Sequence, residues 1–344
     1  MITIRMSLLI VFFCSFLTTC HAGQKIQLVE EAVSGDVGNL AEIEQTTSEK
    51  APDDGYVANE AVVKCFDAMK YHYTGGRYIN TPVYFRLFSP ATLEPGKKYP
   101  LVVWLHGTGE SDDDNKRQLS HMQSMIRDLS GARRLNIFIL ATQCPKDNRD
   151  WLHSMSHEGK GDAPLTITKE ILDVLINEYP IDEKAVSLFG ICSGASAAWD
   201  WALKTPERFV SIGVCSAQPP GQSNLFSLKD TKIWIFNNID DAGSPIKPIR
   251  EFMSKLEVAG VDSFLTEGIG SHNSWSKALL DQKAISWMAL QRKGEWSPPP
   301  GVLVHDTYFA CPGWGQQFWM FWLPGMLIVV TVLYRITLFF RKIP

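Results

Sequence analysis

The sequence lacks an excess of positive charge. Its 344 residues carry 33 Lys and Arg against 37 Asp and Glu, a formal net charge of −4, and no stretch forms a long basic stripe. A nucleic-acid-binding surface needs such a concentration of positive charge. We therefore expect no nucleic acid among the partners.

Closely paired cysteines and internal repeats are also missing. Seven cysteines are present, and the five beyond residue 22 stand far apart, at Cys65, Cys144, Cys192, Cys215 and Cys311. Metal sites usually bring cysteines in close pairs, so we expect no bound metal. Spacing alone assigns no disulfide, but an odd number leaves at least one cysteine unpaired within the chain.

The first 22 residues have the layout of a secretory signal. Arg5 precedes an apolar run at residues 8–13, and small or polar residues follow up to Ala22. This order predicts a signal peptide at 1–22, cleaved after Ala22. An uncleaved anchor and lipid attachment at Cys20 are the alternatives.

A second apolar stretch, residues 318–340, is long enough for a transmembrane helix, which needs roughly 20 residues. Arg341 and Lys342 follow it, so we expect a basic cytoplasmic tail at 341–344. Trp314, Trp319 and Trp322 would then mark the opposite interface. A buried core helix and a cleaved sorting tail remain alternatives.

Two segments differ in composition from the rest. Residues 23–60 are acidic with few aromatic residues, which predicts a disordered linker. Residues 293–317 contain Trp296-Ser297-Pro298-Pro299-Pro300-Gly301, which predicts a stiff stalk. One domain is therefore expected at 61–292.

Within this domain, apolar runs alternate with helical patterns, which predicts an α/β fold: a mostly parallel sheet with helices on both faces. The expected strands are 83–88 as a half-exposed edge strand, then 101–105, 137–141, 185–189, 211–215, 232–236 and 261–265. One predicted helix carries an apolar stripe of Leu119, Met122, Met125, Ile126 and Leu129. Another runs through residues 167–176 and ends before Pro180.

The motif Gly190-Ile191-Cys192-Ser193-Gly194 falls between a predicted strand and a predicted helix. A nucleophile on so tight a turn needs small residues two positions to either side, which selects Cys192 and disfavours Ser193. The positive end of the following helix should favour the thiolate. A buried, inert cysteine is the alternative.

An oxyanion hole should combine the amide after the nucleophile with an amide from an earlier loop. Ser193 would supply the first. The turn His106-Gly107-Thr108-Gly109 follows the predicted strand 101–105 and would supply the second through Thr108.

The acid and the base should follow the nucleophile in that order. Asp240 and Asp241 come after the predicted strand 232–236, and His272 comes after 261–265. His272 would take the thiol proton while the carboxylate orients its ring. The residues alone leave both aspartates open, and an exposed histidine with no role is the alternative for His272.

These residues resemble the secreted prolyl-oligopeptidase-like carboxylesterases, which are related to polyhydroxybutyrate depolymerases and feruloyl esterases of the α/β-hydrolase superfamily. The resemblance covers roughly residues 96–292. It rests on Tyr99–Glu110, Asp114-Asn115, Gln118-Leu119, Gln143-Cys144-Pro145 with Trp151, Tyr179–Asp182, the Cys192 motif with Trp199, Pro206–Phe209 and His272–Trp275.

The resemblance implies an extracytoplasmic ester hydrolase with a small cap and no cofactor. It places Cys192 as nucleophile, Asp241 as acid and His272 as base, with oxyanion donors at Thr108 and Ser193. His106, Gly107, Trp151 and Trp275 are candidates for the substrate pocket. The chain departs from the family pattern at Cys192 itself, where serine is usual, and at Asn237-Asn238, Thr142 and Ala195.

The resulting hypothesis is an exported hydrolase, anchored in the membrane by its C-terminal helix. It would cleave a small-molecule or polymeric carboxylic ester, a lactone or a thioester through Cys192, His272 and Asp241 and an acyl-enzyme intermediate. Two alternatives remain: a catalytically inactive binding protein with the same fold, and a peptidase of the prolyl-oligopeptidase-like group.

Overall fold

The computed structural model describes residues 26–28, 57–73, 75, 82–130, 134–146, 148–153, 163–221, 224–281, 283–293 and 307–310. The predicted signal peptide at 1–22 and the predicted basic tail at 341–344 lie outside the described residues. Export of the protein therefore stays a prediction.

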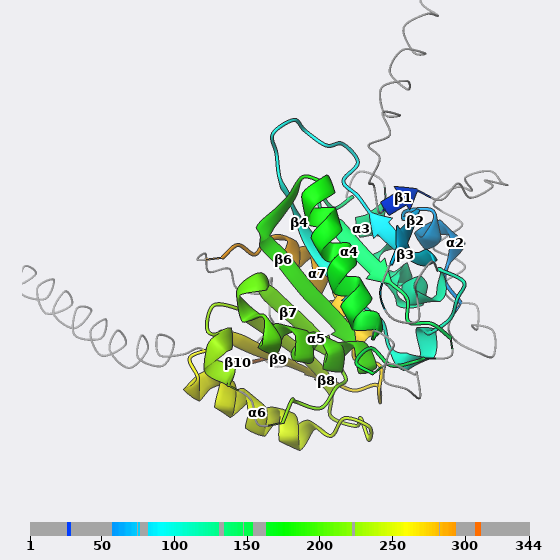
Figure 1. Ribbon diagram of the computed structural model, residues 1–344. Helices are drawn as coiled ribbons and strands as arrows, with labels where there is room; N and C mark the ends of the chain where they lie inside the picture. Colours follow the sequence, from blue (N-terminus) through cyan, green and yellow to red (C-terminus); the bar gives the residue numbers. More distant parts are fainter. Residues whose placement is uncertain are drawn as a thin grey trace, which may run out of the picture.

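One ten-stranded sheet forms the centre of the described structure (Figure 1). In spatial order its strands are β1 (Ile26–Leu28), β2 (Asp67–His72), β3 (Pro82–Phe88), β5 (Phe138–Thr142), β4 (Tyr99–Leu105), β6 (Ile181–Ile191), β7 (Ser211–Cys215), β8 (Lys232–Asn238), β9 (Ser263–Gly268) and β10 (Thr307–Ala310). The six strands from β5 to β9 are parallel, and the outer pairs are antiparallel. The predicted mostly parallel α/β sheet is confirmed for this central part.

The prediction that residues 83–88 form an edge strand is wrong. β2 pairs with residues 82–87 of β3, and β5 pairs with the other edge of β3, so β3 lies inside the sheet. β2 was not predicted, because its sequence Asp-Ala-Met-Lys-Tyr-His mixes charged and apolar residues without a clear period.

Two strands come from segments that were predicted to lie outside the domain. β1 belongs to the predicted acidic linker and pairs with β2. β10 belongs to the predicted stalk and pairs with β9. Both add to an edge of the sheet through backbone hydrogen bonds, which need no apolar sequence pattern.

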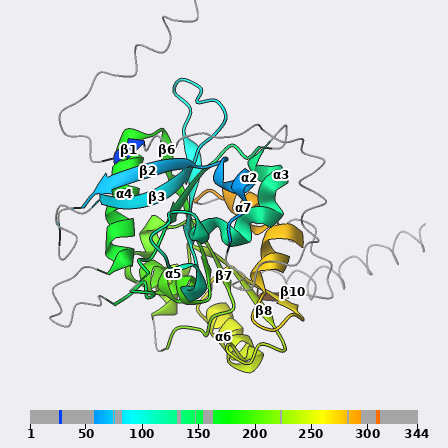
Figure 2. The ribbon, with the colours of Figure 1, turned by 90° about the vertical axis from the view of Figure 1, so that its right-hand side faces the viewer.

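Helices cover both faces of the sheet, as predicted. α4 (Pro164–Glu178), α5 (Ser193–Lys204) and α6 (Ile246–Val258) pack on one face. The other face is covered by α2 (Glu60–Val63), α3 (Ile126–Leu129), α7 (Ala284–Ala289), the 3₁₀-helix Arg117–Met125 and the π-helix Lys277–Asp281. Figure 2 shows α4 and α5 on one side of the sheet and α2, α3 and α7 on the other.

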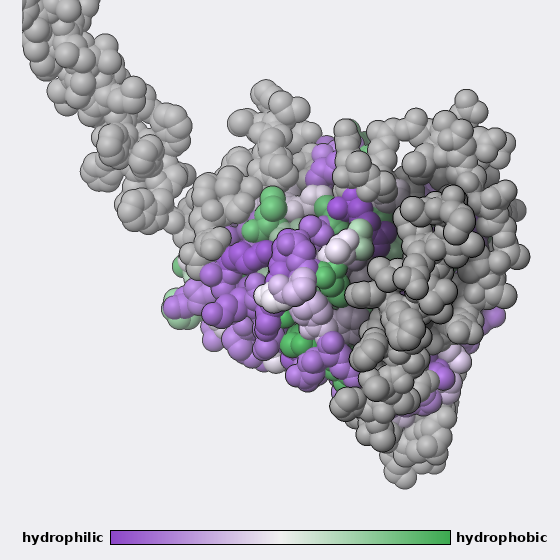
Figure 3. All heavy atoms as spheres, turned by 90° about the horizontal axis from the view of Figure 1, so that it is seen from above, coloured by the Kyte–Doolittle hydropathy of each residue, from purple (hydrophilic) through white to green (hydrophobic). Residues whose placement is uncertain are grey.

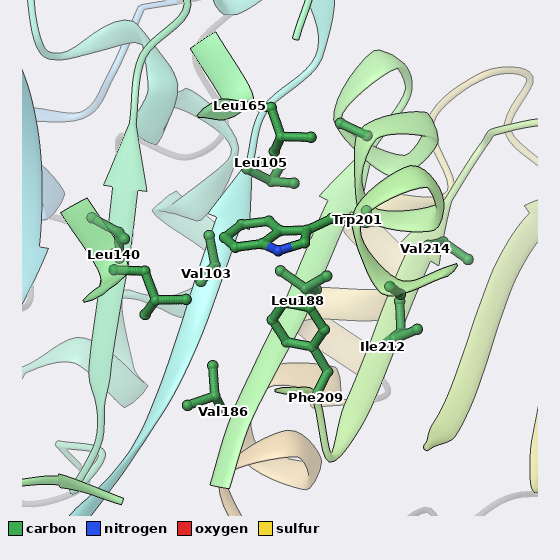
Figure 4. Packing of buried hydrophobic residues seen from close by; sticks show 14 of the residues in the cluster. Val103, Leu105, Leu140, Leu165, Val186, Leu188, Trp201, Phe209, Ile212 and Val214 are labelled. Atoms are coloured by element: carbon green, nitrogen blue, oxygen red, sulfur yellow. The ribbon is translucent and has the colours of Figure 1, made fainter. Parts of the chain in front are cut away.

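Alternate side chains of the central strands supply the two halves of the core. In β4, Leu101, Val103 and Leu105 belong to the α4–α6 side, whereas Val102 and Trp104 belong to the α7 side. The buried Trp201 of α5 lies among the side chains of β4, β6 and β7 (Figure 4). Such a tryptophan fixes α5, and with it the turn that precedes α5, to the sheet.

The predicted helix with the apolar stripe is a nine-residue 3₁₀-helix, Arg117–Met125, continued by α3. Leu119, Met122, Met125 and Leu129 are buried, as the stripe predicted. The predicted helix through residues 167–176 is α4, which ends at Glu178, two residues before Pro180. The described residues between β4 and β5 pack against the sheet. The small cap that the resemblance implies stays a prediction.

The predicted fold class included a C-terminal transmembrane helix, and this part needs a correction. No helix in the described part of the chain is long and apolar enough to cross a membrane. The segment predicted to form it, residues 318–340, lies outside the described residues. On the described surface seen in Figure 3, hydrophilic side chains predominate and apolar ones form smaller patches.

Candidate active site

Cys192 is the single residue between the end of β6 and the start of α5. Its backbone has φ 52° and ψ −119°, a conformation that costs energy in a residue with a side chain. The neighbouring glycines are required by space: a Cβ on Gly190 would lie 2.3 Å from the Gly194 oxygen, and one on Gly194 would lie 2.1 Å from the Leu105 oxygen. The turn therefore has the geometry that the motif predicted, with Cys192 at its apex.

The backbone amides of Thr108 and Ser193 lie close to Cys192 and lower the pKa of its thiol. Thr108 begins a short 3₁₀-helix directly after β4, and Ser193 begins α5. The structure thus brings together the two amides that were predicted as oxyanion donors. Both lie near the thiol at which an acyl group would be attached.

The pKa of the Cys192 thiol is raised above its ordinary value. Burial is the largest cause, and the carboxylates of Glu110 and Asp241 add to it, while the two amides act in the opposite direction. The sequence predicted a favoured thiolate at the start of α5. The Ser193 amide at the start of α5 does act in that direction, but burial outweighs it.

His106 and Trp151, predicted to line a substrate pocket, are fully buried. They lie at the turn of residues 106–109 after β4, which we call the oxyanion loop. The Cys144 amide donates to His106 Nε2 at 2.9 Å, so the ring proton is on Nδ1, which lies 2.6 Å from the Gly107 oxygen. Trp151 Nε1 donates to the His106 oxygen at 2.9 Å. Both side chains hold the backbone of the loop in place and do not face a substrate.

His272 lies against Asp241. Its Nδ1 is 2.9 Å from Oδ2 and 3.1 Å from Oδ1, and the Asp241 side chain is only 1% exposed. The amides of Gly243 and Ser244 also donate to Asp241 Oδ1. The Asp241 carboxylate is therefore held both by the imidazole ring and by the two backbone amides.

Asp240 has a different position. Its exposed carboxylate accepts the amides of Gly270 and Ser271, both at 3.0 Å, and these bonds lower its pKa. Asp240 thus holds the backbone before His272 but does not touch the ring. Of the two aspartates left open by the sequence, Asp241 is the one beside the imidazole.

Two buried serine hydroxyls hold the backbone of His272 in place. Ser216 Oγ donates to the His272 oxygen at 2.6 Å and lies 2.8 Å from Ser274 Oγ, which is 2.9 Å from the Phe236 oxygen. Ser216 has a positive φ of 51°. Sequence reasoning missed Ser216, because an isolated serine after a strand carries no signal of its own.

The imidazole of His272 makes no hydrogen bond to Cys192 among the described residues, and its side chain is 42% exposed. Trp275, another predicted pocket residue, lies beside it, with ring centroids 5.7 Å apart. The opposite neighbour of Trp275 is His121, at 5.0 Å. Among the predicted pocket residues that are aromatic, Trp275 alone is half-buried, and it lies beside His272.

Glu110 and His121 were not predicted as site residues. Glu110 is 2% exposed, and its Oε1 lies 2.7 Å from His121 Nε2. Burial acts to raise the pKa of Glu110, but the hydrogen bond from His121 and the nearby imidazoles leave it below its ordinary value. A charged carboxylate is thereby kept inside the protein next to the oxyanion loop.

No group of three or more His, Cys, Asp or Glu that could hold a metal ion occurs in the described part of the chain. The four described cysteines, at positions 65, 144, 192 and 215, are free thiols.

Comparisons with known proteins agree with this fold. The model of the Esterase family, described as "Putative esterase", matches residues 76–284. The solved structure of a thermostable esterase is similar with a TM-score of 0.59 and 28% identity, covering 67% of this chain and 64% of that one. A ferulic acid esterase is similar in fold, with a TM-score of 0.51 and 16% identity, covering 64% of this chain and 95% of that one.

A curated relative is more distant. The hematopoietic progenitor cell antigen CD34 of Canis lupus familiaris is 23% identical over 181 residues, which covers 46% of this chain and 45% of that protein. The chain therefore spans less than two thirds of the length of this relative and of the thermostable esterase.

Proposed function

The chain belongs to the Esterase family, and on that premise we propose that it hydrolyses carboxylic esters through Cys192, His272 and Asp241. The family and the similar esterase structure support the prediction of an ester hydrolase. The assignment of Cys192 as nucleophile is supported by one observation: Cys192 lies at the apex of the tight turn between β6 and α5, with φ 52° and with glycines on both sides that leave no room for a Cβ.

In the proposed first half-reaction, Cys192 Sγ forms a bond to the ester carbonyl carbon while its proton passes to His272 Nε2. The carbonyl oxygen becomes an oxyanion, which the Thr108 and Ser193 amides stabilise. Such donors are worth about 10²–10³ in rate each. The carbon–oxygen bond to the alcohol then breaks, and the leaving oxygen takes the proton from His272.

In the second half-reaction, water attacks the acyl carbon and gives its proton to His272. The carbon–sulfur bond breaks, the acid leaves, and the proton returns to Cys192. Asp241 accepts a hydrogen bond from the Nδ1–H of His272 throughout, so Nε2 is the nitrogen that exchanges protons. The buried carboxylate of Asp241 stabilises the imidazolium that His272 forms transiently.

The decisive experiment is mass spectrometry of the full chain after brief exposure to p-nitrophenyl acetate. We expect an acetyl group on Cys192 that forms and decays in the wild type. His272→Ala should reduce its formation by about 10³-fold or more, because the thiol then has no base. His72→Ala is a matched control, since this exposed histidine ends β2, away from the site.

A second candidate function is a binding protein that has lost turnover. It is favoured by the absence of a hydrogen bond between Cys192 and His272 in the described structure and by the raised thiol pKa. In that case no acyl-cysteine would form in the wild type, and Cys192→Ala would leave ligand affinity unchanged.

A further inference from the structure

Glu110 has one carboxylate oxygen with a partner and one without. Oε1 lies 2.7 Å from His121 Nε2. Oε2 is buried and has no hydrogen-bond partner among the described residues. His106 Nδ1 is 3.9 Å away, but its proton is directed to the Gly107 oxygen. A buried carboxylate oxygen without a donor is unusual in a folded protein and calls for a physical reason.

The unpartnered oxygen faces the nucleophile across Gly107. The point where a Cβ on Gly107 would sit is 3.0 Å from Glu110 Oε2 and 3.2 Å from Cys192 Cβ. No side chain separates the two groups, because residue 107 has none. The carboxylate therefore acts on Cys192 across a short gap beside the buried Glu110 side chain, where charges interact more strongly than in bulk water.

The charges around Cys192 come from several elements. Glu110, after β4, and Asp241, after β8, present negative charge, while the Thr108 and Ser193 amides present partial positive charge. His272, after β9, is the remaining titratable group of the proposed triad, and Asp241 is bound to it. Glu110 itself is faced by His121 and His106.

Both oxygens of Asp241 accept hydrogen bonds, from His272 and from two backbone amides, whereas Glu110 Oε2 has no hydrogen-bond partner among the described residues. A thiolate on Cys192 would stand near this unbonded oxygen of a charged carboxylate. A neutral thiol would not be repelled by it.

Resting on the proposed function, we propose that Glu110 is a positioning residue that holds the resting Cys192 as a neutral thiol. The nucleophile then loses its proton to His272 only while it attacks the ester carbonyl. The consequence is selectivity: the enzyme reacts with bound esters but slowly with general alkylating or oxidising agents. The raised pKa of Cys192 agrees with this arrangement.

The test is the pH dependence of Cys192 alkylation by iodoacetamide in the full chain, followed by mass spectrometry of the peptide that contains Cys192. Glu110→Gln keeps the shape of the side chain and removes its charge. We expect the pH midpoint of alkylation to fall by at least about one unit relative to the wild type. An unchanged midpoint in a variant with a native circular dichroism spectrum overturns the proposal.

Glu183→Gln is the matched control. This exposed glutamate lies near the start of β6, the strand whose far end leads to Cys192, about 30 Å away at the usual strand rise. Its midpoint should equal that of the wild type. If the Glu110 variant does not fold, the wild type alone decides: a midpoint below the ordinary cysteine value of about 8.5 overturns the proposal.

Alkylation requires no ester turnover, so this proposal and the proposed function fail separately. An active esterase whose midpoint does not move in Glu110→Gln refutes only the role of Glu110. A protein without acyl-cysteine formation whose midpoint does move refutes only the proposed function.

Discussion

Asp241 holds His272 by its Nδ1, at 2.9 Å and 3.1 Å from the two carboxylate oxygens. Because an ionised carboxylate only accepts hydrogen bonds, this contact places the ring proton on Nδ1 and leaves Nε2 free to accept a proton. The backbone next to His272 is fixed by a different carboxylate, that of Asp240. Two adjacent aspartates thus act on one histidine in different ways.

The two aspartates should be separable by mutation. Asp241→Asn removes the acceptor that sets the tautomer, and we expect kcat for ester hydrolysis to fall by about 10³-fold or more. Asp240→Asn only weakens two bonds to exposed amides, so we expect a loss of about tenfold or less. Steady-state kinetics with p-nitrophenyl acetate measures both; equal losses would contradict the assignment of Asp241.

A single substitution can delete the backbone N–H of Thr108. Thr108 is the first residue of a 3₁₀-helix and follows Gly107 in extended conformation, a position where proline is tolerated. Thr108→Pro deletes the N–H, and we expect kcat to fall by about 10²–10³-fold. Thr108→Ala, which keeps the N–H, is the control and should stay within a few-fold of the wild type. Comparable kcat values for the two variants would exclude this amide as an oxyanion donor.

Gly194 should tolerate no side chain. A Cβ there would lie 2.1 Å from the Leu105 oxygen, so β4 and α5 would have to separate. We expect Gly194→Ala to lower the free energy of unfolding in urea by about 3 kcal/mol or more. Gly221→Ala is the control, because a Cβ on Gly221 would meet no atom within 4 Å. A stable Gly194 variant would show that the turn can open.

Ser216 should matter for catalysis although it is remote from the substrate. Its hydroxyl bonds the His272 oxygen at 2.6 Å, so Ser216→Ala should loosen the base. We expect a loss of about 1–2 kcal/mol in the free energy of unfolding and a lower kcat with little change in KM. Ser227→Ala, which removes an exposed local hydrogen bond, is the control. An unchanged kcat would show that this bond does not position His272.

The stability that Glu110 contributes should depend on pH. Its pKa in the folded protein is lower than in the unfolded chain, where it is about 4.3. Charged Glu110 therefore stabilises the fold above about pH 4.3, and this contribution is lost as the pH falls through the folded pKa. The difference in free energy of unfolding between wild type and Glu110→Gln should be larger in urea titrations at about pH 6 than at about pH 3.5. A difference that grows toward acid pH would contradict the lowered pKa.

Much of the fold followed from local patterns. The strand β7 was predicted with its exact bounds, and β4, β5 and β8 within a few residues, because buried parallel strands are short, continuous apolar runs. β2 was missed because its residues lack a period, and β1 and β10 because backbone pairing leaves no trace in a sequence. The predicted transmembrane helix rested on length, hydropathy, the cations that follow it and the tryptophans before it, and the described part of the chain contains no helix that could cross a membrane.

The sequence by itself determined the order of the groups: a small-residue turn around Cys192, a loop with Thr108, and an aspartate and a histidine after later strands. Parallel strands end at one edge of a sheet, so that order was enough to bring these groups together. Only the tertiary structure decided which aspartate touches His272, that His106 and Trp151 support the oxyanion loop, and that Glu110 faces Cys192 across Gly107. Those choices depend on distances of a few ångströms between residues far apart in the chain, and no local pattern records them.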